Sequence, residues 1–343
     1  MDMRRLNTFG IQAVAPLVFK IQSAEDYRQF LHHPASRHAP PLILGGGSNV
    51  LFTDAPARPV LHMAVPGISI IAEDDDVAWV KAGAGVVWHD LVSFAVSRNL
   101  GGIENLSLIP GLCGAAPMQN IGAYGTELTD VFVELEALER STGKLVMFSR
   151  EDCEFGYRSS VFKTSQRDRY LIYSITLKLS KRPVPDLRYG ALRQYLAENA
   201  IHQPDIRQVS EAVIAIRQSK LPDWREYGNA GSFFKNPVIS QEAFTALCER
   251  TGREADDIPH YPAGAESIKV PAGWLIERAG WKGYRDGAVG CWPKQALVIV
   301  NYGDATGADI LAFARRIRND VHEKYGVRLY PEVNLIGMSQ EEF

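Results

Sequence analysis

Cysteine is scarce in this chain, and the few thiols are scattered. The 343 residues include Cys113, Cys153, Cys248 and Cys291. None belongs to a CxxC pair or has a histidine beside it at metal-ligand spacing, so we expect neither disulfides nor structural zinc. Long apolar runs are also missing, since no stretch approaches the roughly 20 residues that span a bilayer. The first residues lack the apolar core of a secretory signal. These absences predict a cytoplasmic protein.

The chain also lacks a large excess of either positive or negative charge. Lysine and arginine number 37 against 40 aspartates and glutamates, which gives a formal net charge of -3. Such a balance argues against nucleic acid or a membrane surface as a partner, and an anionic ligand would need a local basic cluster. A hydrophobic content of 46% is typical of a globular enzyme. A chain of this length is expected to form two or three domains, because single cores rarely exceed roughly 250–300 residues.

Strands and helices alternate without a regular βαβ period, which indicates an α+β fold. Apolar periodicity, caps and breakers predict helices over Ser23 to Leu31, over Val87 to Arg98, from Ile206 up to Pro222 and from Ile310 up to Gly326. Strands are expected at residues 41–44, 68–71, 79–81, 131–138, 144–148 and 170–179. Pro183-Val184-Pro185 is expected to be a linker.

Two glycine-rich segments are candidates for binding a cofactor. Gly45-Gly46-Gly47-Ser48-Asn49 follows a short strand, and its backbone N–H groups can converge on phosphate oxygens. It lacks the lysine of a P-loop and the GxGxxG spacing, and a plain glycine turn remains an alternative. Ile109 to Gly125 is the second segment, in which Gln119 and Asn120 can hydrogen-bond a ligand or satisfy the loop's own backbone. Together they predict a large cofactor with a diphosphate.

A hydroxyl in a dry setting is predicted within Gly228 to Pro237. Small residues precede Ser232, and Phe233 and Phe234 follow it. Such a hydroxyl can donate a proton to a bound substrate. The alternative is a strand that begins at a turn, with Phe233 in a core and Ser232 capping a backbone amide.

Charged candidates lie elsewhere in the chain. Arg158, between aromatic residues, can hold a carboxylate with two hydrogen bonds, or it is a surface arginine stacked on its neighbour. Glu332, which we expect at the end of the last strand, is a buried carboxylic acid or a solvated one. Arg217 and Lys220 share a helix face. With the tyrosines Tyr189 and Tyr261 they can grip a phosphorylated ligand, or they form a solvated face. Metal catalysis and a Ser-His-Asp triad have no support.

In this order the segments resemble the UDP-N-acetylenolpyruvoylglucosamine reductases, flavoenzymes of bacterial peptidoglycan precursor synthesis. The resemblance runs from Asn7-Thr8-Phe9-Gly10 to Pro331-Glu332-Val333 and includes Ala272-Gly273-Trp274. It implies noncovalent FAD in a two-part α+β domain of the vanillyl-alcohol-oxidase type, with a C-terminal substrate-binding domain. We expect the FAD-binding region at 13–183, with subdomains of about 1–66 and 67–205. The substrate domain is expected at 206–325, and a segment at 326–343 returns Glu332 towards the flavin.

The resemblance also implies roles for individual residues. The residues expected to contact FAD are Gly45, Gly46, Gly47, Ser48, Asn49, Pro110, Gly111, Ala115, Ala116, Gln119, Asn120, Gly122, Tyr124, Gly125 and Ile172. Those expected to contact the sugar nucleotide are Tyr157, Tyr189, Arg217, Lys220, Asn236, Tyr261 and Gln295. Tyr261 fits the extra loop of the family's type I members. The catalytic residues carried over are Arg158, Ser232 and Glu332.

The implied reaction has two halves. NADPH reduces FAD, and hydride then passes to the enolpyruvyl methylene of UDP-N-acetylglucosamine enolpyruvate, giving UDP-N-acetylmuramate. Ser232 protonates the adjacent carbon, while Arg158 and Glu332 stabilise the charged intermediate. Lys220 is expected to meet the NADPH phosphates as well, since both substrates use one site in turn, and the protein is expected to be a monomer. Two alternatives remain: a flavin oxidase of the same cofactor fold, and a binding or sensor protein that has lost turnover.

Overall fold

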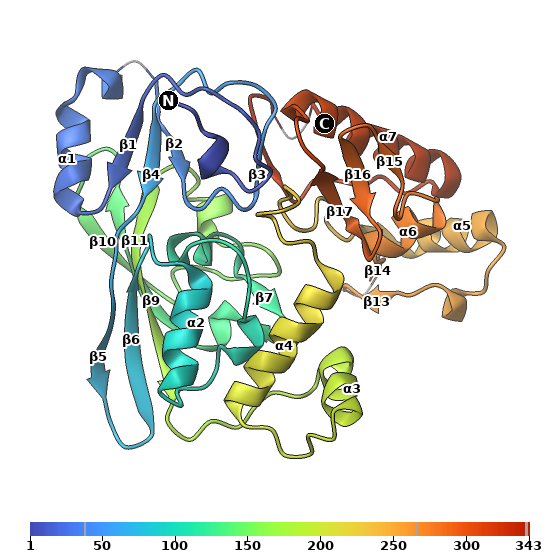
Figure 1. Cartoon of the computed structure of the whole chain (residues 1–343), viewed down its shortest axis with the longest axis horizontal. Coiled ribbons are helices and arrows are strands. Elements are labelled where there is room, and N and C mark those ends of the chain that lie inside the picture. Colours follow the sequence, from blue (N-terminus) through green and yellow to red (C-terminus); the bar gives the residue numbers. More distant parts are fainter. Residues whose placement is uncertain (38, 265, 340–341) are drawn as a thin grey trace. The chain divides into compact units, whose positions relative to one another are not determined.

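The chain folds into two compact units in the computed structural model, which describes residues 1–37, 39–264, 266–339 and 342–343. Unit 1 consists of Met1–Val14, Gly47–Pro56 and Lys220–Phe343. Unit 2 consists of Ala15–Gly46 and Ala57–Ser219. Each unit contains both sheets and helices (Figure 1), which confirms the predicted α+β class.

Unit 2 is built on a five-stranded antiparallel sheet of order β10-β9-β11-β6-β5 and a three-stranded parallel sheet of order β1-β4-β2. The strands are β1 (Val18–Ile21), β2 (Leu42–Leu44), β4 (Val60–Met63), β5 (Ile68–Glu73), β6 (Val77–Gly83), β9 (Phe132–Glu139), β10 (Leu145–Ser149) and β11 (Tyr170–Ser180), with a small pair of β7 (Gly122–Ala123) and β8 (Thr126–Glu127). The helices are α1 (Ala24–His32), α2 (Trp88–Ser97), α3 (Gly190–Glu198) and α4 (Ile206–Lys220), the last belonging to this unit up to Ser219.

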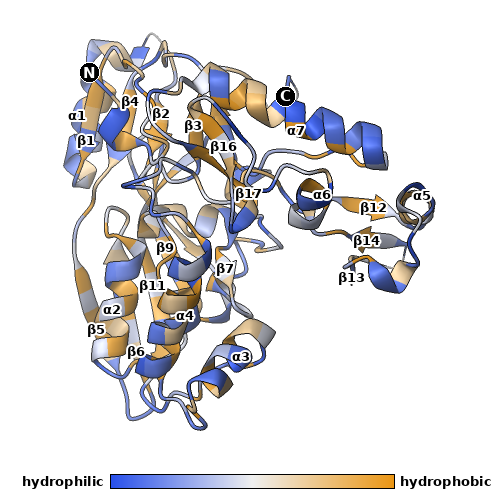
Figure 2. Cartoon of the chain, turned by 45° about the vertical axis from the view of Figure 1, so that its right-hand side comes forward, coloured by the Kyte–Doolittle hydropathy of each residue, from blue (hydrophilic) through white to orange (hydrophobic). Residues whose placement is uncertain are grey.

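The main core of unit 2 lies between α2 and the larger sheet. Alternate residues of β6, among them Val80 and Ala82, are buried, as the period of two in a strand dictates. They share one buried cluster with Trp88 and Leu91 of α2. Figure 2 shows β6, β9 and β11 as largely hydrophobic strands, while α7 (Gly307–Tyr325) of unit 1 shows hydrophilic turns. The apolar pattern therefore positions α2 on the sheet.

Unit 1 contains several small sheets. The antiparallel sheets have the orders β15-β16-β17 and β12-β14-β13, and β18 pairs in parallel with β3. The strands are β3 (Val50–Phe52), β12 (Val238–Ser240), β13 (Tyr261–Pro262), β14 (Ser267–Lys269), β15 (Arg285–Asp286), β16 (Val289–Trp292), β17 (Gln295–Asn301) and β18 (Asn334–Ile336). The helices are α5 (Gln241–Thr251), α6 (Ala272–Arg278) and α7. Across the described ranges, no helix combines the length and the apolar character needed to cross a membrane.

The predicted helices are all present, and the capping box at Ser23 is formed as expected, with the Asp26 amide donating to the serine hydroxyl. The second glycine-rich segment and the residues before it form short 3-10 turns, at Glu104–Leu106, Cys113–Ala115 and Pro117–Gln119. The expectation that Glu332 ends the last strand is wrong. The final strand, β18, begins two residues later at Asn334, because it pairs with β3 there.

The capping box of α7 gives a testable contribution to stability. The Thr306 hydroxyl accepts a hydrogen bond from the Asp309 amide at 3.2 Å, and the Asp309 carboxylate accepts one from the Thr306 amide at 2.8 Å. We expect Thr306→Ala to lower the free energy of unfolding by about 1 kcal/mol, measured by denaturant titration at neutral pH.

The effect should depend on pH. Hydrogen bonds from the Thr306 hydroxyl and amide hold the pKa of Asp309 below its usual value. A carboxylate with a lowered folded-state pKa stabilises the fold above its unfolded pKa of about 3.9, and that stabilisation is lost as the pH falls. The difference between variant and wild type should therefore shrink in acid, whereas an equal difference at all pH values would contradict this assignment.

Candidate active site

Unit 1 places Ser232 and Glu332 on neighbouring, paired segments. The Phe233 amide donates to the Leu297 carbonyl of β17 at 2.8 Å. The Phe233 carbonyl in turn accepts a hydrogen bond from the Glu332 amide at 2.8 Å. Ser232 is therefore one residue away from the point where its segment meets the backbone of Glu332. Both side chains are half-buried, which leaves them within reach of a ligand.

Ser232 is followed by two buried aromatic residues that pack in the core of unit 1. Phe233 and Phe234 are 0% and 1% exposed, and their ring centroids lie 5.1 Å apart. Phe9 meets Phe233 edge to face at 6.5 Å. Phe233 thus occupies a core while the segment also presents the serine hydroxyl, so the structural interpretation of the motif and the chemical one are compatible.

The second half of the first glycine-rich segment belongs to the same unit and contacts the Glu332 segment. The Asn49 side-chain amide donates to the Glu332 carbonyl at 3.4 Å. The backbone amide of Asn334 donates to the Asn49 carbonyl at 3.0 Å, and its side-chain amide does so at 2.9 Å. Gly47 has φ +63°, and an added Cβ would lie 2.0 Å from the Leu6 carbonyl oxygen. Glycine is required there, and Ser48 and Asn49 follow half-buried.

In unit 2 the first half of that segment lies against the second glycine-rich segment. A Cβ on Gly46 would lie 3.5 Å from the Gly111 Cα, and one on Gly45 would lie 3.8 Å from the Ala115 Cβ. Gly111 has φ +117°, a conformation that favours glycine. The Leu112 side chain is nearest to Gly46, with its Cγ 3.4 Å from an added Cβ, so the two glycine-rich segments pack directly against each other.

The other residues of the second segment that we expect to contact FAD differ in their exposure and in their own hydrogen bonds. Asn120 is buried with φ +42°; its amide donates to the Glu127 carboxylate at 2.8 Å and its oxygen accepts from the Thr129 amide at 3.0 Å. The structural alternative therefore holds for this side chain, and only its backbone is left for a ligand. Gln119 and Gly122 are half-buried, Gly125 is exposed, and Ala116 and Ile172 are buried at 2% and 6%.

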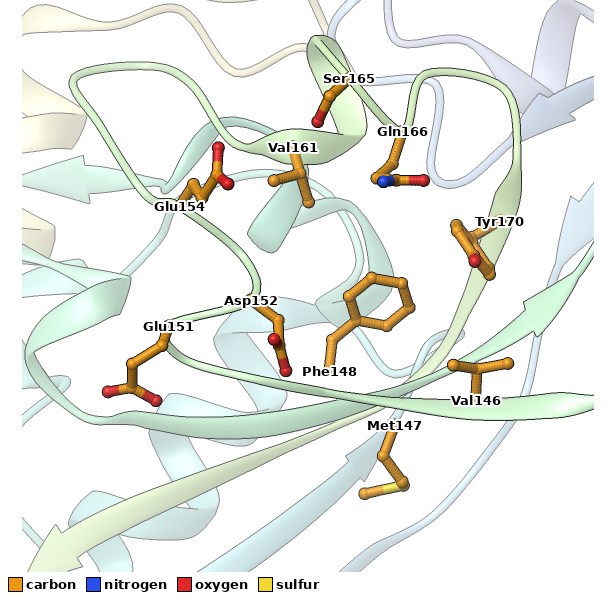
Figure 3. A pocket seen from close by; sticks show the side chains of 10 residues that line it. All are labelled: Val146, Met147, Phe148, Glu151, Asp152, Glu154, Val161, Ser165, Gln166 and Tyr170. Atoms are coloured by element: carbon orange, nitrogen blue, oxygen red, sulfur yellow. The ribbon is translucent and has the colours of Figure 1, made fainter.

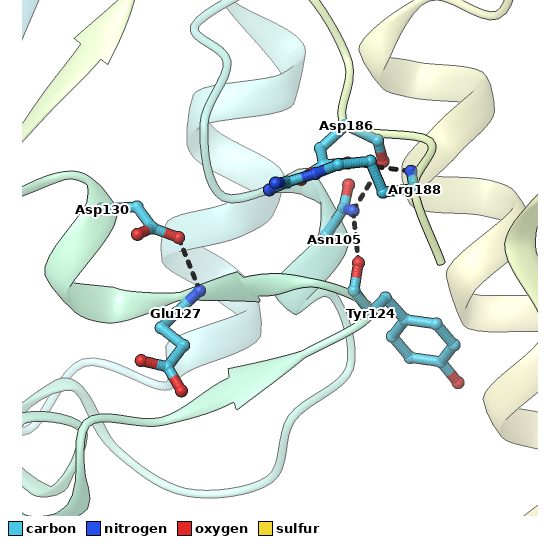
Figure 4. Close-up of polar contacts among 6 residues, drawn as sticks. All are labelled: Asn105, Tyr124, Glu127, Asp130, Asp186 and Arg188. Carbon is cyan, nitrogen blue, oxygen red and sulfur yellow. Dashed lines mark hydrogen bonds and ion pairs between the residues drawn. The ribbon is translucent and has the colours of Figure 1, made fainter. Parts of the chain in front are cut away.

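Tyr124 is held by a buried asparagine that the sequence did not single out (Figure 4). The Asn105 amide donates to the carbonyls of Tyr124 and Asp186, both at 2.9 Å. Asp186 binds Arg188 in an ion pair. Asn105 thereby ties the end of the glycine-rich segment to the chain that leads to Tyr189, whose ring centroid is 5.1 Å from that of Tyr124. A lone asparagine beside a leucine gave no signal for this role.

Arg217 of α4 points its guanidinium at the same tyrosine. It donates a hydrogen bond to the Tyr124 hydroxyl, and burial lowers its pKa. Burial raises the pKa of Tyr124, an effect that the charge of Arg217 opposes. The Nε atom of Arg217 is buried and has no hydrogen-bond partner among the described residues. A partly buried cation with an unused donor is suited to bind an anion.

Arg158 lies in unit 2, and its backbone is unusual. Its φ is +53°, which is uncommon for a residue with a Cβ and often accompanies function. The guanidinium donates to the Gly122 carbonyl at 3.1 Å, and its centre is 5.9 Å from the ring centroid of Tyr157. Tyr157 is 56% exposed. The side chain is thus directed to the second glycine-rich segment, and stacking on Tyr157 is at most loose.

The expected sugar-nucleotide residues of unit 1 gather in part around the start of α6. The Asn236 oxygen accepts a hydrogen bond from the Ala272 amide at 3.0 Å, so its amide group remains for a ligand. A Cβ on Gly273 would lie 3.5 Å from Gln295 Oε1. Tyr261 lies on β13 and is 56% exposed, and Lys220 is the exposed last residue of α4. Asn236 and Gln295 thus both lie beside the first two residues of α6, Ala272 and Gly273.

A separate pocket of about 510 Å³ lies in unit 2 beside β10 (Figure 3). Its lining includes Glu151, Asp152 and Glu154 but none of the residues that the motifs single out. Asp152 accepts hydrogen bonds from Ser149 and so shapes a turn. Carboxylates would repel a phosphorylated ligand, so this pocket is not the site that the motifs predict.

Comparison with known proteins gives two family matches and many relatives. A profile for the C-terminal domain of UDP-N-acetylenolpyruvoylglucosamine reductase matches residues 223–336, and one for an FAD binding domain matches residues 15–149. The chain is 47% identical to the UDP-N-acetylenolpyruvoylglucosamine reductase of Pseudomonas aeruginosa over 334 residues, covering 97% of both chains. It is 44% identical to that of Flavobacterium johnsoniae over 336 residues, covering 98% of both.

Solved structures share the fold. The UDP-N-acetylenolpyruvylglucosamine reductase of Thermus caldophilus is similar with a TM-score of 0.67 and 23% identity, over 98% of this chain and 97% of that one. The 4-ethylphenol oxidase of Gulosibacter chungangensis is similar with a TM-score of 0.52 and 13% identity, over 97% of this chain and 84% of that one. The expected fold, an FAD-binding domain with a C-terminal reductase domain, is thereby confirmed.

The residues present fit an FAD molecule. Gly45 and Gly46 lie against Gly111, Leu112 and Ala115, and the backbone N–H groups of consecutive glycines suit a diphosphate. The family profiles, the identity over nearly the whole chain and this geometry agree. The chain belongs to the UDP-N-acetylenolpyruvoylglucosamine reductases, a family of FAD-dependent oxidoreductases.

Proposed function

We propose that this protein reduces UDP-N-acetylglucosamine enolpyruvate to UDP-N-acetylmuramate with NADPH in the cytoplasm, as a monomer. The observation that supports the proposal is the backbone hydrogen bond between the Phe233 carbonyl and the Glu332 amide. It joins the segment that carries the Ser232 hydroxyl to the segment that carries the Glu332 carboxyl group, and Phe233 and Phe234 in the first segment are buried. Such groups can deliver a proton to the carbon next to the one that receives the hydride.

The chemistry that FAD supplies when bound is the transfer of a hydride from NADPH to the enolpyruvyl methylene carbon. Ser232 gives its proton to the adjacent carbon, so the hydride and the proton together saturate the double bond. Arg158 supplies a cation for the charge that builds on the carboxyl group. Glu332, when protonated, donates a hydrogen bond to the same group. The phenylalanines exclude water from the carbon that is protonated.

Binding of the nucleotide is assigned to the remaining residues. Arg217 and Lys220 neutralise the diphosphate. The other residues assigned to the sugar nucleotide are Tyr157, Tyr189, Asn236, Gln295 and Tyr261, the last in the loop typical of type I members. The domain limits proposed for these tasks are 13–183 for FAD, 206–325 for the substrate and 326–343 for the segment that carries Glu332. FAD itself is assigned to Gly45–Asn49 and to the contacts named above in 110–125, with Ile172.

Steady-state kinetics of the FAD-loaded protein tests the proposal. We expect NADPH oxidation only when UDP-N-acetylglucosamine enolpyruvate is present. Because Lys220 is assigned to both substrates, they should occupy one site in turn and give parallel lines in double-reciprocal plots, which indicates a ping-pong mechanism. Fast peroxide formation in air without the sugar nucleotide would instead indicate an oxidase. Binding of the sugar nucleotide without any turnover would indicate a sensor, and intersecting lines would refute the shared site.

A further inference from the structure

A buried polar pair in unit 1 lies behind the Ser232 turn. Thr8 and Asn229 are each 6% exposed. The Thr8 hydroxyl donates to the Asn229 carbonyl at 2.6 Å, and the Asn229 amide donates to the Thr8 carbonyl at 2.9 Å. The Thr8 hydroxyl also lies 3.4 Å from the Gly47 carbonyl, which accepts from the Thr8 amide at 3.0 Å. Thr8 therefore links Gly47, in the first glycine-rich segment, to Asn229, in the turn that precedes Ser232.

The Asn229 side chain closes that turn from within. Its Oδ1 accepts a hydrogen bond from the Gly231 amide at 3.0 Å, and its Nδ2 donates to the Tyr227 carbonyl at 2.8 Å. Gly231 has φ +70°, the conformation that lets the chain reverse direction one residue before Ser232. An asparagine side chain that binds the backbone two residues on is a well-known way to stabilise such a turn.

The turn is also fixed on its other side. The Asn301 amide of β17 donates to the Gly228 carbonyl at 2.7 Å, and the Asn301 side chain donates to the Phe9 carbonyl at 2.9 Å. A Cβ on Gly228 would lie 2.2 Å from that same Phe9 oxygen. Gly228, just before Asn229, is therefore held by β17. The Asn229 side chain then links the Tyr227 carbonyl to the Gly231 amide across the turn.

We propose that Asn229 and Thr8 are positioning residues that hold the Ser232 hydroxyl in the orientation in which it delivers its proton. This inference rests on the proposed role of Ser232 as the proton donor. A general acid must stay within hydrogen-bond reach of the atom it protonates. A displacement of about 1 Å can lower the rate by roughly a hundredfold. Neither residue touches the substrate in this account; both act through the backbone of the turn.

The test separates the two half-reactions of the FAD-loaded enzyme under anaerobic conditions. In Asn229→Ala, reduction by NADPH should proceed at the wild-type rate. Return of the flavin absorbance on addition of UDP-N-acetylglucosamine enolpyruvate should slow by about ten- to a hundredfold. Thr8→Ser, which keeps the hydroxyl that donates to the Asn229 carbonyl, should behave as wild type, and Thr8→Val should resemble Asn229→Ala.

A second readout distinguishes positioning from general destabilisation. Delivery from Ser232 protonates one face of the carbon, so wild type should give a single configuration there. Misplacement of the hydroxyl lets water compete, and Asn229→Ala should give a mixture of configurations. Thr306→Ala, destabilised at the N-terminal cap of α7 and without a hydrogen bond to Asn229 or Thr8 among the described residues, should show neither the slow step nor the mixture. If Asn229→Ala does not fold, the same two readouts are compared between Thr8→Ser and Thr8→Val. A slow second half-reaction and a mixture of configurations in Thr8→Val alone would support the positioning role.

The double variant Ser232→Ala/Asn229→Ala separates this inference from the function on which it rests. If Asn229 acts through Ser232, the loss of rate caused by Asn229→Ala should largely disappear when Ser232 is already alanine. Equal losses in both backgrounds, or two slowed half-reactions, would overturn the positioning role while leaving the function intact. A wild-type second half-reaction in Ser232→Ala would instead overturn the proposed proton donor.

Discussion

Ser232→Ala should slow the step in which substrate is reduced by about 10²–10⁴-fold, the contribution typical of a well-placed general acid. The reduction of bound FAD by NADPH should be unchanged, because no proton from Ser232 is needed there. The basis is the position of the serine, half-buried next to the fully buried Phe233 and one residue from the backbone contact with Glu332. Anaerobic stopped-flow measurement of the two half-reactions gives both rates from one preparation.

The matched control for this variant is Ser240→Ala. Ser240 lies in the same unit and caps α5 by accepting a hydrogen bond from the Ala243 amide at 3.2 Å. Ser240→Ala should lower the free energy of unfolding by about 1 kcal/mol and leave the rates of both half-reactions unchanged. Losing Ser232 without slowing the second half-reaction would show that another group, or water, supplies the proton.

Gly47→Ala should cost about 3 kcal/mol of stability and weaken FAD binding. Its added Cβ would lie 2.0 Å from the Leu6 carbonyl oxygen and 2.7 Å from the Asn7 Cα. Both contacts are with backbone, so no side-chain rotation relieves them, and φ +63° adds strain for a residue with a Cβ. Denaturant unfolding gives the loss of stability, and titration of the apoprotein with FAD gives the loss of affinity.

Gly10→Ala separates the two causes. Gly10 lies in the same unit with φ +67°, but nothing lies within 4 Å of an added Cβ. It should therefore show only the cost of the left-handed conformation, about 1 kcal/mol, with little change in FAD affinity. Equal losses in the two variants would mean that the close approach at Leu6 has no energetic role.

Local signals in the sequence predicted the parts of the fold that depend on neighbours in the chain. Ser23 and Asp26 are three residues apart, and the capping box they predict is present. Helices α3, α5 and α6 were not predicted, and α6 has only seven residues, too few for a periodic pattern to stand out. The prediction that Glu332 ends the last strand is wrong because pairing with β3, which no local pattern reveals, decides where β18 begins.

The same distinction applies to the candidate site. The motif around Ser232 and the glycine-rich segments were visible as patterns of small residues, and the structure brings the two segments together at Gly46 and Gly111. The contact between Thr8 and Asn229 joins residues 221 positions apart. Neither residue type predicts such a partner, since threonine and asparagine occur in many turns. Long-range hydrogen bonds of this kind become visible only in the folded chain.

The most direct test of the account is to compare NADPH consumed with product formed. The FAD-loaded enzyme is incubated without oxygen with NADPH and UDP-N-acetylglucosamine enolpyruvate, and the sugar nucleotide is then analysed by mass spectrometry. We predict that NADPH and substrate disappear in equal amounts and that the product carries two more hydrogens than the substrate. Consumption of NADPH with the sugar nucleotide unchanged, or no consumption at all, would contradict the proposed function.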